Sequence, residues 1–191
     1  MKRQLKKVVC LALITSMILG QKTLKTTKNV TAKEKKDIKI AIDAGHQARG
    51  NFATEPVGPG SSTRKAKVAG GATGVASHVP EYKLTLAVSK KLQKELKARG
   101  YKVYMIRTKN NVNISNKKRA QLANKSGADI YIRIHADSSN SRAVTGASGL
   151  YPSKANRYVS KLSAKSKKLS SCLLKSYCKK TKIRNRGLVA R

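Results

Sequence analysis

Acidic residues are scarce in this sequence. Asp and Glu together number 8, whereas Lys and Arg number 43, so the formal net charge is +35. A charge of that sign and size attracts polyanions, which include nucleic acids, anionic membranes and anionic wall polymers. Aromatic residues are also few, with no Trp and a single Phe. This scarcity argues against a surface on which nucleic-acid bases stack, and it requires a core of aliphatic side chains.

Cysteines are equally rare, at three in the whole chain. Cys10 lies in an apolar N-terminal run, while Cys172 and Cys178 are six residues apart in a segment with helical character. On one helix that spacing puts the two side chains on different faces, roughly 9 Å apart along the axis. We therefore expect Cys172 and Cys178 to be free and mostly buried thiols.

Only one long apolar run occurs, VVCLALITSMILG, and it follows the basic segment MKRQLKK. Thirteen residues are few for a membrane span but suit the apolar part of a secretory signal peptide. Because Ile18 fits poorly at a cleavage site after Gly20, residues 1–20 are predicted to be a signal peptide or a retained N-terminal anchor. Export predicts a secreted, cell-wall-associated protein, argues against nucleic acid as a partner and confines membrane contact to this segment. Residues 21–37 lack an apolar period and are predicted to be a basic linker.

From Ile38 onward, segments with strand and helix patterns alternate. The pattern predicts strands at residues 38–43, 101–108, 128–137 and, less regularly, 146–152. It predicts helices at residues 80–100, 114–127 and roughly 155–177. A stretch dense in Gly, Ser and Pro, residues 47–78, is predicted to be a long loop. This order predicts an α/β fold with three layers, α/β/α, around a mostly parallel twisted sheet.

Capping residues support the helix boundaries. Pro80 suits the first turn of one helix and Gly100 its end, and Ser115 is the expected N-cap of the next helix. Two apolar stripes are expected to face inward. They are Leu84, Val88, Leu92 and Leu96 on the helix at 80–100, and Leu162, Leu169 and Leu173 on the last helix.

Two of the three histidines stand at the carboxyl ends of predicted strands. His46 follows the first strand in IKIAIDAGHQ, and His135 ends the third in ADIYIRIHAD. The carboxyl ends of parallel strands meet at one edge of a sheet, where the sites of α/β proteins form. Two histidines and one carboxylate are a known ligand set for catalytic zinc. We therefore predict a metal site at this edge, although a hydrogen-bonded loop residue remains the alternative for either histidine alone.

The third ligand must come from the eight acidic residues. Glu81 is best placed, because the topology brings the start of the helix at 80–100 back to the same sheet edge. Asp43 is expected to orient neighbouring groups, and Glu55 and Asp137 are weaker candidates. His78, in the extended stretch before Pro80, remains an alternative ligand.

Three segments in order carry a family resemblance: IDAGHQ, GATGVASHVPEYKLTLAVSKKLQKELKARGYKVYMIRT and NISNKKRAQLANKSGADIYIRIHADSS. They resemble the zinc-dependent N-acetylmuramoyl-L-alanine amidases, which are peptidoglycan hydrolases. The resemblance implies that residues 38–191 form the catalytic domain, with Zn²⁺ held by His46, Glu81 and His135. It also implies hydrolysis of the amide between N-acetylmuramic acid and L-alanine. Peptidoglycan and anionic cell-wall polymers are the expected partners.

The family pattern carries further expectations. Its catalytic glutamate belongs to a VE-x-GF-like motif after a segment resembling NRGLVAR, so the general base is expected beyond Arg191 and the domain to be C-terminally incomplete. Asp137 stands where the family more often has Asn. Arg107 and Arg119 are predicted either to contact a substrate carboxylate or to pair with an acid or a backbone carbonyl. A catalytically inactive or weak wall-binding relative is the alternative function.

Overall fold

The structure is a computed structural model that describes residues 34–139, 141 and 143–191. The signal peptide or anchor predicted at 1–20, and most of the linker predicted at 21–37, lie outside the described residues. The end of that linker, Lys35–Asp37, forms a short 3-10 turn rather than extended chain. The described residues divide into two compact units, one within Val30–Asn140 and the other within Ser141–Arg191, and each is described by itself.

A parallel sheet forms the centre of the first unit. Strand β1 (Lys39–Ala44) lies between β4 (Lys102–Met105) and β5 (Ile130–Ile134), and both neighbours run parallel to it. Successive residues of β1 point to opposite faces of the sheet, and they are buried on both faces, as expected for a central parallel strand. All three strands were predicted, and the sheet is parallel as predicted.

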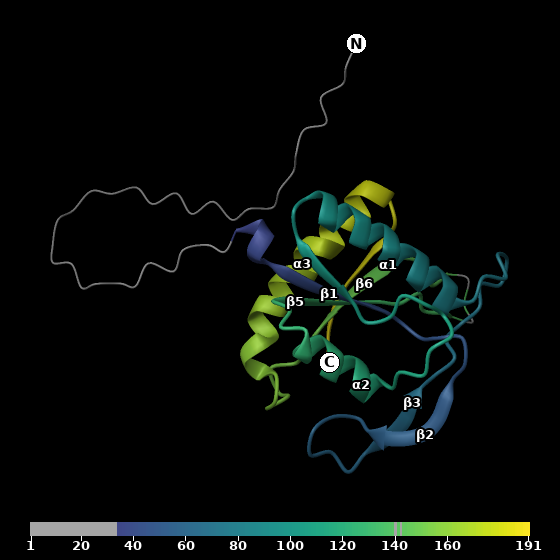
Figure 1. Cartoon of the computed structure of the whole chain (residues 1–191). Helices are drawn as coiled ribbons and strands as arrows, with labels where there is room; N and C mark the ends of the chain where they lie inside the picture. Colours follow the sequence, from purple (N-terminus) through teal and green to yellow (C-terminus); the bar gives the residue numbers. More distant parts are fainter. Residues whose placement is uncertain (1–33, 140, 142) are drawn as a thin grey trace, which may run out of the picture. The chain divides into compact units, whose positions relative to one another are not determined.

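Two helices cover this sheet, α1 over Glu81–Ala98 and α2 over Asn116–Lys125. Ile42 points to the face where Leu86 of α1 packs, whereas its neighbour Ala41 packs with Ala123 of α2 on the other face. Helix, sheet and helix therefore make the three predicted layers (Figure 1). Ser115 caps α2 by accepting from the Lys118 amide, and Gly100 follows α1 with φ +88°, so both predicted caps are confirmed.

The predicted apolar stripe of α1 is half wrong. Leu92 and Leu96 pack against the core, but Leu84 and Val88 are exposed. The buried face carries Thr85 and Ser89 in their place, which shifts it by one residue. The Thr85 hydroxyl donates to the Gly45 carbonyl at 2.8 Å, so a polar contact to the loop after β1 decides the helix rotation.

The long loop predicted at 47–78 contains a β-hairpin. Strands β2 (Asn51–Pro56) and β3 (Arg64–Val68) pair in antiparallel fashion, and Figure 1 shows them as a separate arm. Glu55, expected in a mobile loop, is a buried residue of β2 whose carboxylate accepts from the Lys117 amide at 2.8 Å. That contact ties the hairpin to the first turn of α2.

In the second unit a helix packs on a pair of parallel strands. The elements are β6 (Ala147–Tyr151), a 3-10 turn (Ser160–Leu162), α3 (Ser163–Thr181) and β7 (Asn185–Ala190). Helix α3 begins later and ends later than predicted. Its buried leucine is Leu174. Of the predicted stripe, Leu169 is half-buried, whereas Leu162 and Leu173 are exposed, so the stripe is wrong at these two positions.

Cys172 and Cys178 are free, as predicted, but they are half-buried rather than mostly buried. Among the described residues, no helix combines the length and the apolar character that crossing a bilayer requires.

Candidate metal centre

The three residues predicted as metal ligands lie together at one edge of the sheet. His46 follows β1, Glu81 is the first residue of α1, and His135 follows β5. One ligand atom from each residue lies within 4.8 Å of the others. Three segments far apart in the sequence therefore converge on one point, as the carboxyl-end rule for parallel sheets requires.

Glu81 is the centre of the cluster, because its two carboxylate oxygens face the two imidazoles. Oε2 lies 3.2 Å from Nε2 of His46, and Oε1 lies 2.9 Å from Nδ1 of His135. The same oxygens accept from the backbone amides of Ala72 and Ala136, at 3.0 and 2.8 Å. The carboxylate is thereby fixed in orientation by two loops as well as by α1.

The position of the proton on the His46 ring suits a histidine that binds a cation through Nε2. Its Nδ1 lies 2.8 Å from the carbonyl oxygen of Ala69, and a carbonyl can only accept, so Nδ1 carries the proton. In the neutral ring Nε2 is then an acceptor that faces another acceptor, the Glu81 carboxylate. Either a second proton on Nε2 or a metal ion between Nε2 and the carboxylate removes this conflict. The Ala69 contact is the outer support typical of metal-binding histidines.

His135 is held on both nitrogens. Nδ1 faces Glu81, and Nε2 lies 3.0 Å from Nε of Arg133, which can only donate. Burial lowers the pKa of His135, the Glu81 hydrogen bond opposes this, and the charges of Arg133 and His46 lower it further. The net shift favours the neutral imidazole that a metal requires. Binding an ion through Nδ1 leaves the proton on Nε2, so Arg133 must then give up this contact and keep its others, to Asn116 and Asp43.

Glu81 remains ionised in this environment. Burial alone would raise its pKa, but the amides of Ala72 and Ala136, the His135 hydrogen bond and the charge of protonated His46 outweigh it and lower the pKa below the usual value. When both imidazoles are neutral, the cluster offers two ring nitrogens and one anionic oxygen, a donor set that catalytic zinc uses.

Two glycines allow the loops to approach the cluster. A Cβ on Gly71 would lie 2.8 Å from the His46 ring and 3.1 Å from Glu81 Oε2, and φ there is +85°. A Cβ on Gly45 would lie 2.6 Å from the His135 ring. His46 itself has φ +59°, a conformation that costs free energy in a non-glycine residue and that clusters at functional sites.

Arg107 and Arg119 support the site from inside the protein. Both are buried, at 2% and 0% exposure. Arg119 pairs with Asp43 and also donates to the carbonyls of Ala44 and His46. Of the two roles predicted for these arginines, pairing with an acid or a backbone carbonyl is the one that the contacts show, and a substrate contact stays a prediction.

Arg107 holds the loop after β1 against α1. Its guanidinium donates to the carbonyls of Ala44, Gly45 and Tyr82 at 2.8–2.9 Å. Burial and the nearby charge of Arg119 lower the pKa of Arg107 to about 10, so it stays charged at neutral pH. The rival ligand His78 is exposed and is not part of the cluster.

Tyr131 and Arg133 belong to this network and were not singled out from the sequence. The Tyr131 hydroxyl donates to the second oxygen of Asp43 at 2.7 Å, which completes the environment of the buried carboxylate. Tyr131 and Arg133 are spaced by two along β5, so they share one face of the strand, and His135 comes two residues later, just after β5 ends. That spacing was the signal available in the sequence.

Tyr131 is expected to ionise later than the other tyrosines of the chain. Burial of its hydroxyl, followed by the charge and hydrogen bond of Asp43, raises the pKa of Tyr131 well above its ordinary value. A raised folded pKa stabilises the fold below the unfolded value of about 10, and this contribution is lost as the pH rises above it. Phenolate absorbance followed during alkaline titration should show one late-ionising group that Tyr131→Phe removes. If Tyr131→Phe leaves the late-ionising group in place, that result would contradict the contact between Tyr131 and Asp43.

An open cavity of about 400 Å³ lies beside the cluster, with Glu81 in its wall. Leu84 of α1 and Asp137, two residues after His135, line it as well. Of the three residues of the cluster, Glu81 alone lines this cavity. Geometry and donor set together describe a candidate metal centre beside it.

Comparison with known proteins identifies the family of the chain. The sequence profile of one family, described as N-acetylmuramoyl-L-alanine amidase, matches residues 40–191. The chain belongs to this amidase family. Its enzyme class is N-acetylmuramoyl-L-alanine amidase, a hydrolase of an amide bond. The resemblance noted in the sequence is confirmed, and so is the α/β fold.

Solved structures of other amidases are similar to the chain. An amidase from Clostridium difficile 630 is 28% identical, with a TM-score of 0.56. The similar region covers 81% of this chain and 69% of that amidase. The CwlV catalytic domain from Bacillus (Paenibacillus) polymyxa is 23% identical with a TM-score of 0.57, covering 79% and 68%. Ami1 from Mycobacterium smegmatis is 24% identical with a TM-score of 0.56, covering 61% and 54%. The chain thus spans from about half to about two thirds of these amidases, and no curated protein matches it.

Proposed function

We propose that this amidase hydrolyses the bond between N-acetylmuramic acid and L-alanine in peptidoglycan with a zinc ion held by His46, Glu81 and His135. The observation that carries the proposal is the opposed pair of acceptors, His46 Nε2 and Glu81 Oε2, at 3.2 Å. A proton on Nε2 or a metal ion can satisfy this pair, and the third ligand atom, which His135 offers within 4.8 Å, favours the metal ion. Two neutral imidazoles with one carboxylate are a ligand set used by catalytic zinc, and thiolates are absent from the cluster.

The protein's own groups prepare the site for this chemistry. Glu81 and His135 are held in the charge states that ligands need, and Arg107 and Arg119 fix the loop that carries His46. A zinc ion bound there supplies a Lewis acid and lowers the pKa of a bound water. The adjoining cavity of about 400 Å³ offers room for the amide and its flanking groups. Following the sequence prediction, we propose a secreted protein that acts at the cell wall.

The second candidate is a wall-binding relative with little or no turnover. One observation favours it, namely that few carboxylates are available as a general base near the cluster. Among the described residues, Asp137 is the one carboxylate besides Glu81 that lines the adjoining cavity. Asp43 and Glu55 are buried and committed to Arg119 and to the Lys117 amide. A general base contributes typically about 10²- to 10⁴-fold, so a site without one would bind far better than it cleaves.

Release of new L-alanine amino termini from purified peptidoglycan distinguishes the two candidates. The full chain is incubated with zinc or with a chelator, and binding to the insoluble wall is measured in the same samples. Zinc-dependent release of L-alanine termini is the expected result. Wall binding without release, by folded protein that retains zinc, would establish the wall-binding relative instead. Release that persists in the chelator would refute the metal mechanism.

A further inference from the structure

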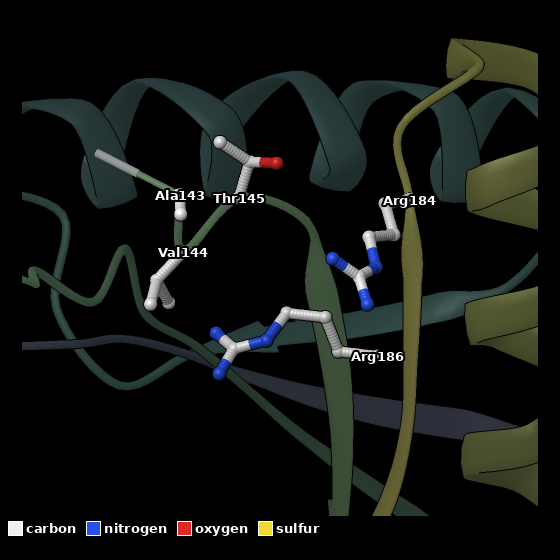
Figure 2. Close-up of a pocket in the computed structure, with 5 residues that line it drawn as sticks. All are labelled: Ala143, Val144, Thr145, Arg184 and Arg186. Atoms are coloured by element: carbon white, nitrogen blue, oxygen red, sulfur yellow. The ribbon is translucent and has the colours of Figure 1, made fainter. Parts of the chain in front are cut away.

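A second cavity lies in the unit formed by residues 141–191. It has a volume of about 300 Å³ and is lined by Ala143, Val144, Thr145, Arg184 and Arg186. Figure 2 shows both guanidinium groups reaching from the β7 segment toward the loop that carries Val144 and Thr145. Alternate residues of an extended segment point to the same side, so Arg184 and Arg186 face this space together.

The backbone around the cavity is shaped to hold Arg186. Gly146 has φ +121°, and a Cβ there would lie 2.5 Å from the Arg184 carbonyl oxygen and 2.9 Å from Cγ of Arg186. The stem of Arg186 therefore lies directly over a position that only glycine leaves open. The Arg184 carbonyl also accepts from the Ala147 amide at 2.9 Å, which fixes the β7 segment beside the loop.

The two arginines lack an internal counter-charge among the described residues. No ion pair joins either guanidinium to a described carboxylate, in contrast to Arg119, which pairs with Asp43. The sequence has no Asp or Glu after Asp137, while Lys and Arg recur to its end. Two like charges converging on one cavity are mutually repulsive unless an anion lies between them.

We propose that Arg184 and Arg186 bind a phosphate group of an anionic wall polymer. Guanidinium is planar and forms paired hydrogen bonds with phosphate, and the Thr145 hydroxyl lies in the same cavity to add another. A polymer is favoured over a single anion because the surrounding segment is basic throughout, and a chain of phosphates gains from each neutralised charge through counterion release. None of its lining residues belongs to the metal cluster, and the site serves retention at the wall rather than hydrolysis.

The test measures binding of the full chain to a phosphodiester-linked polyol polymer, in the presence of a chelator. This polymer contains no amide to cleave, so failure of the zinc mechanism would leave the result unaffected. The double variant Arg184→Gln with Arg186→Gln is compared with Lys168→Gln and Lys175→Gln, two exposed lysines of α3 that remove the same charge elsewhere in the unit. A third protein, Arg184→Lys with Arg186→Lys, keeps the charge but loses the planar fork.

The arginine-to-glutamine variant is expected to bind about 10- to 100-fold more weakly and with a shallower salt dependence. The lysine control should change by about threefold or less, since exposed charges away from the site are screened. The arginine-to-lysine protein should fall between wild type and the glutamine variant. Equal losses in the glutamine variant and the lysine control would overturn the proposal. Displacement by single-stranded DNA at lower phosphate concentration than the polyol polymer would also overturn it.

Discussion

Replacing Glu81 by glutamine is expected to lower the affinity of the chain for zinc by more than about 100-fold, because even residues that only support a metal ligand contribute about 10- to 100-fold. Zinc-dependent amide hydrolysis should be lost with the metal. Glutamine keeps the size of the side chain and can still accept from the Ala72 or Ala136 amide, but it lacks the negative charge. Competition with a chromophoric chelator measures the affinity directly.

Glu95→Gln is the matched control for this prediction. Glu95 lies on the same helix but is exposed, and its partner is Arg99 at 3.1 Å. Its zinc affinity and activity should equal those of the wild type. If the Glu81 and Glu95 variants bound zinc equally well, the metal would lie outside this cluster.

Replacing Arg119 by methionine is expected to lower the free energy of unfolding by about 3–5 kcal/mol, the usual cost of removing one partner from a buried ion pair. Arg119 is fully buried, and its loss leaves the Asp43 carboxylate without its countercharge. The carbonyls of Ala44 and His46 lose a donor as well. Urea unfolding with a chelator present measures the fold without any contribution from bound metal.

Arg99→Met provides the comparison, because Arg99 forms an exposed pair on the surface of α1. It should change the free energy of unfolding by less than about 0.5 kcal/mol. Combining Arg119→Met with Asp43→Asn should recover part of the loss, since no unpaired charge then remains buried. A loss below about 1 kcal/mol in the Arg119 variant would mean that the pair does not hold the site together.

The cluster of His46, Glu81 and His135 could be predicted from sequence because it depends on strand ends. Alternating apolar residues locate β1 and β5, and the residues that follow them, His46 and His135, must then meet at one edge. The position of Glu81 follows from the same topology, since α1 returns to that edge. None of these inferences requires knowledge of side-chain contacts.

The parts that could not be predicted depend on long-range polar contacts. The hairpin β2–β3 has no clean apolar alternation, so its Gly- and Ser-rich surroundings indicate a loop. The rotation of α1 is decided by Thr85 binding the Gly45 carbonyl, which hydrophobic spacing does not reveal. Arg107 and Arg119 are buried although their residue type is usually exposed, because backbone carbonyls of the loop after β1 supply their acceptors.

The ligand set itself is tested most directly by X-ray absorption at the zinc edge on the full chain in solution. We expect two imidazole nitrogens, from His46 and His135, at about 2.0–2.1 Å from the zinc, together with oxygen ligands and no sulfur. Glu81→Gln should abolish this signature. A sulfur shell at about 2.3 Å would assign the zinc to one or more of Cys10, Cys172 and Cys178, and that result would contradict a metal centre at His46, Glu81 and His135.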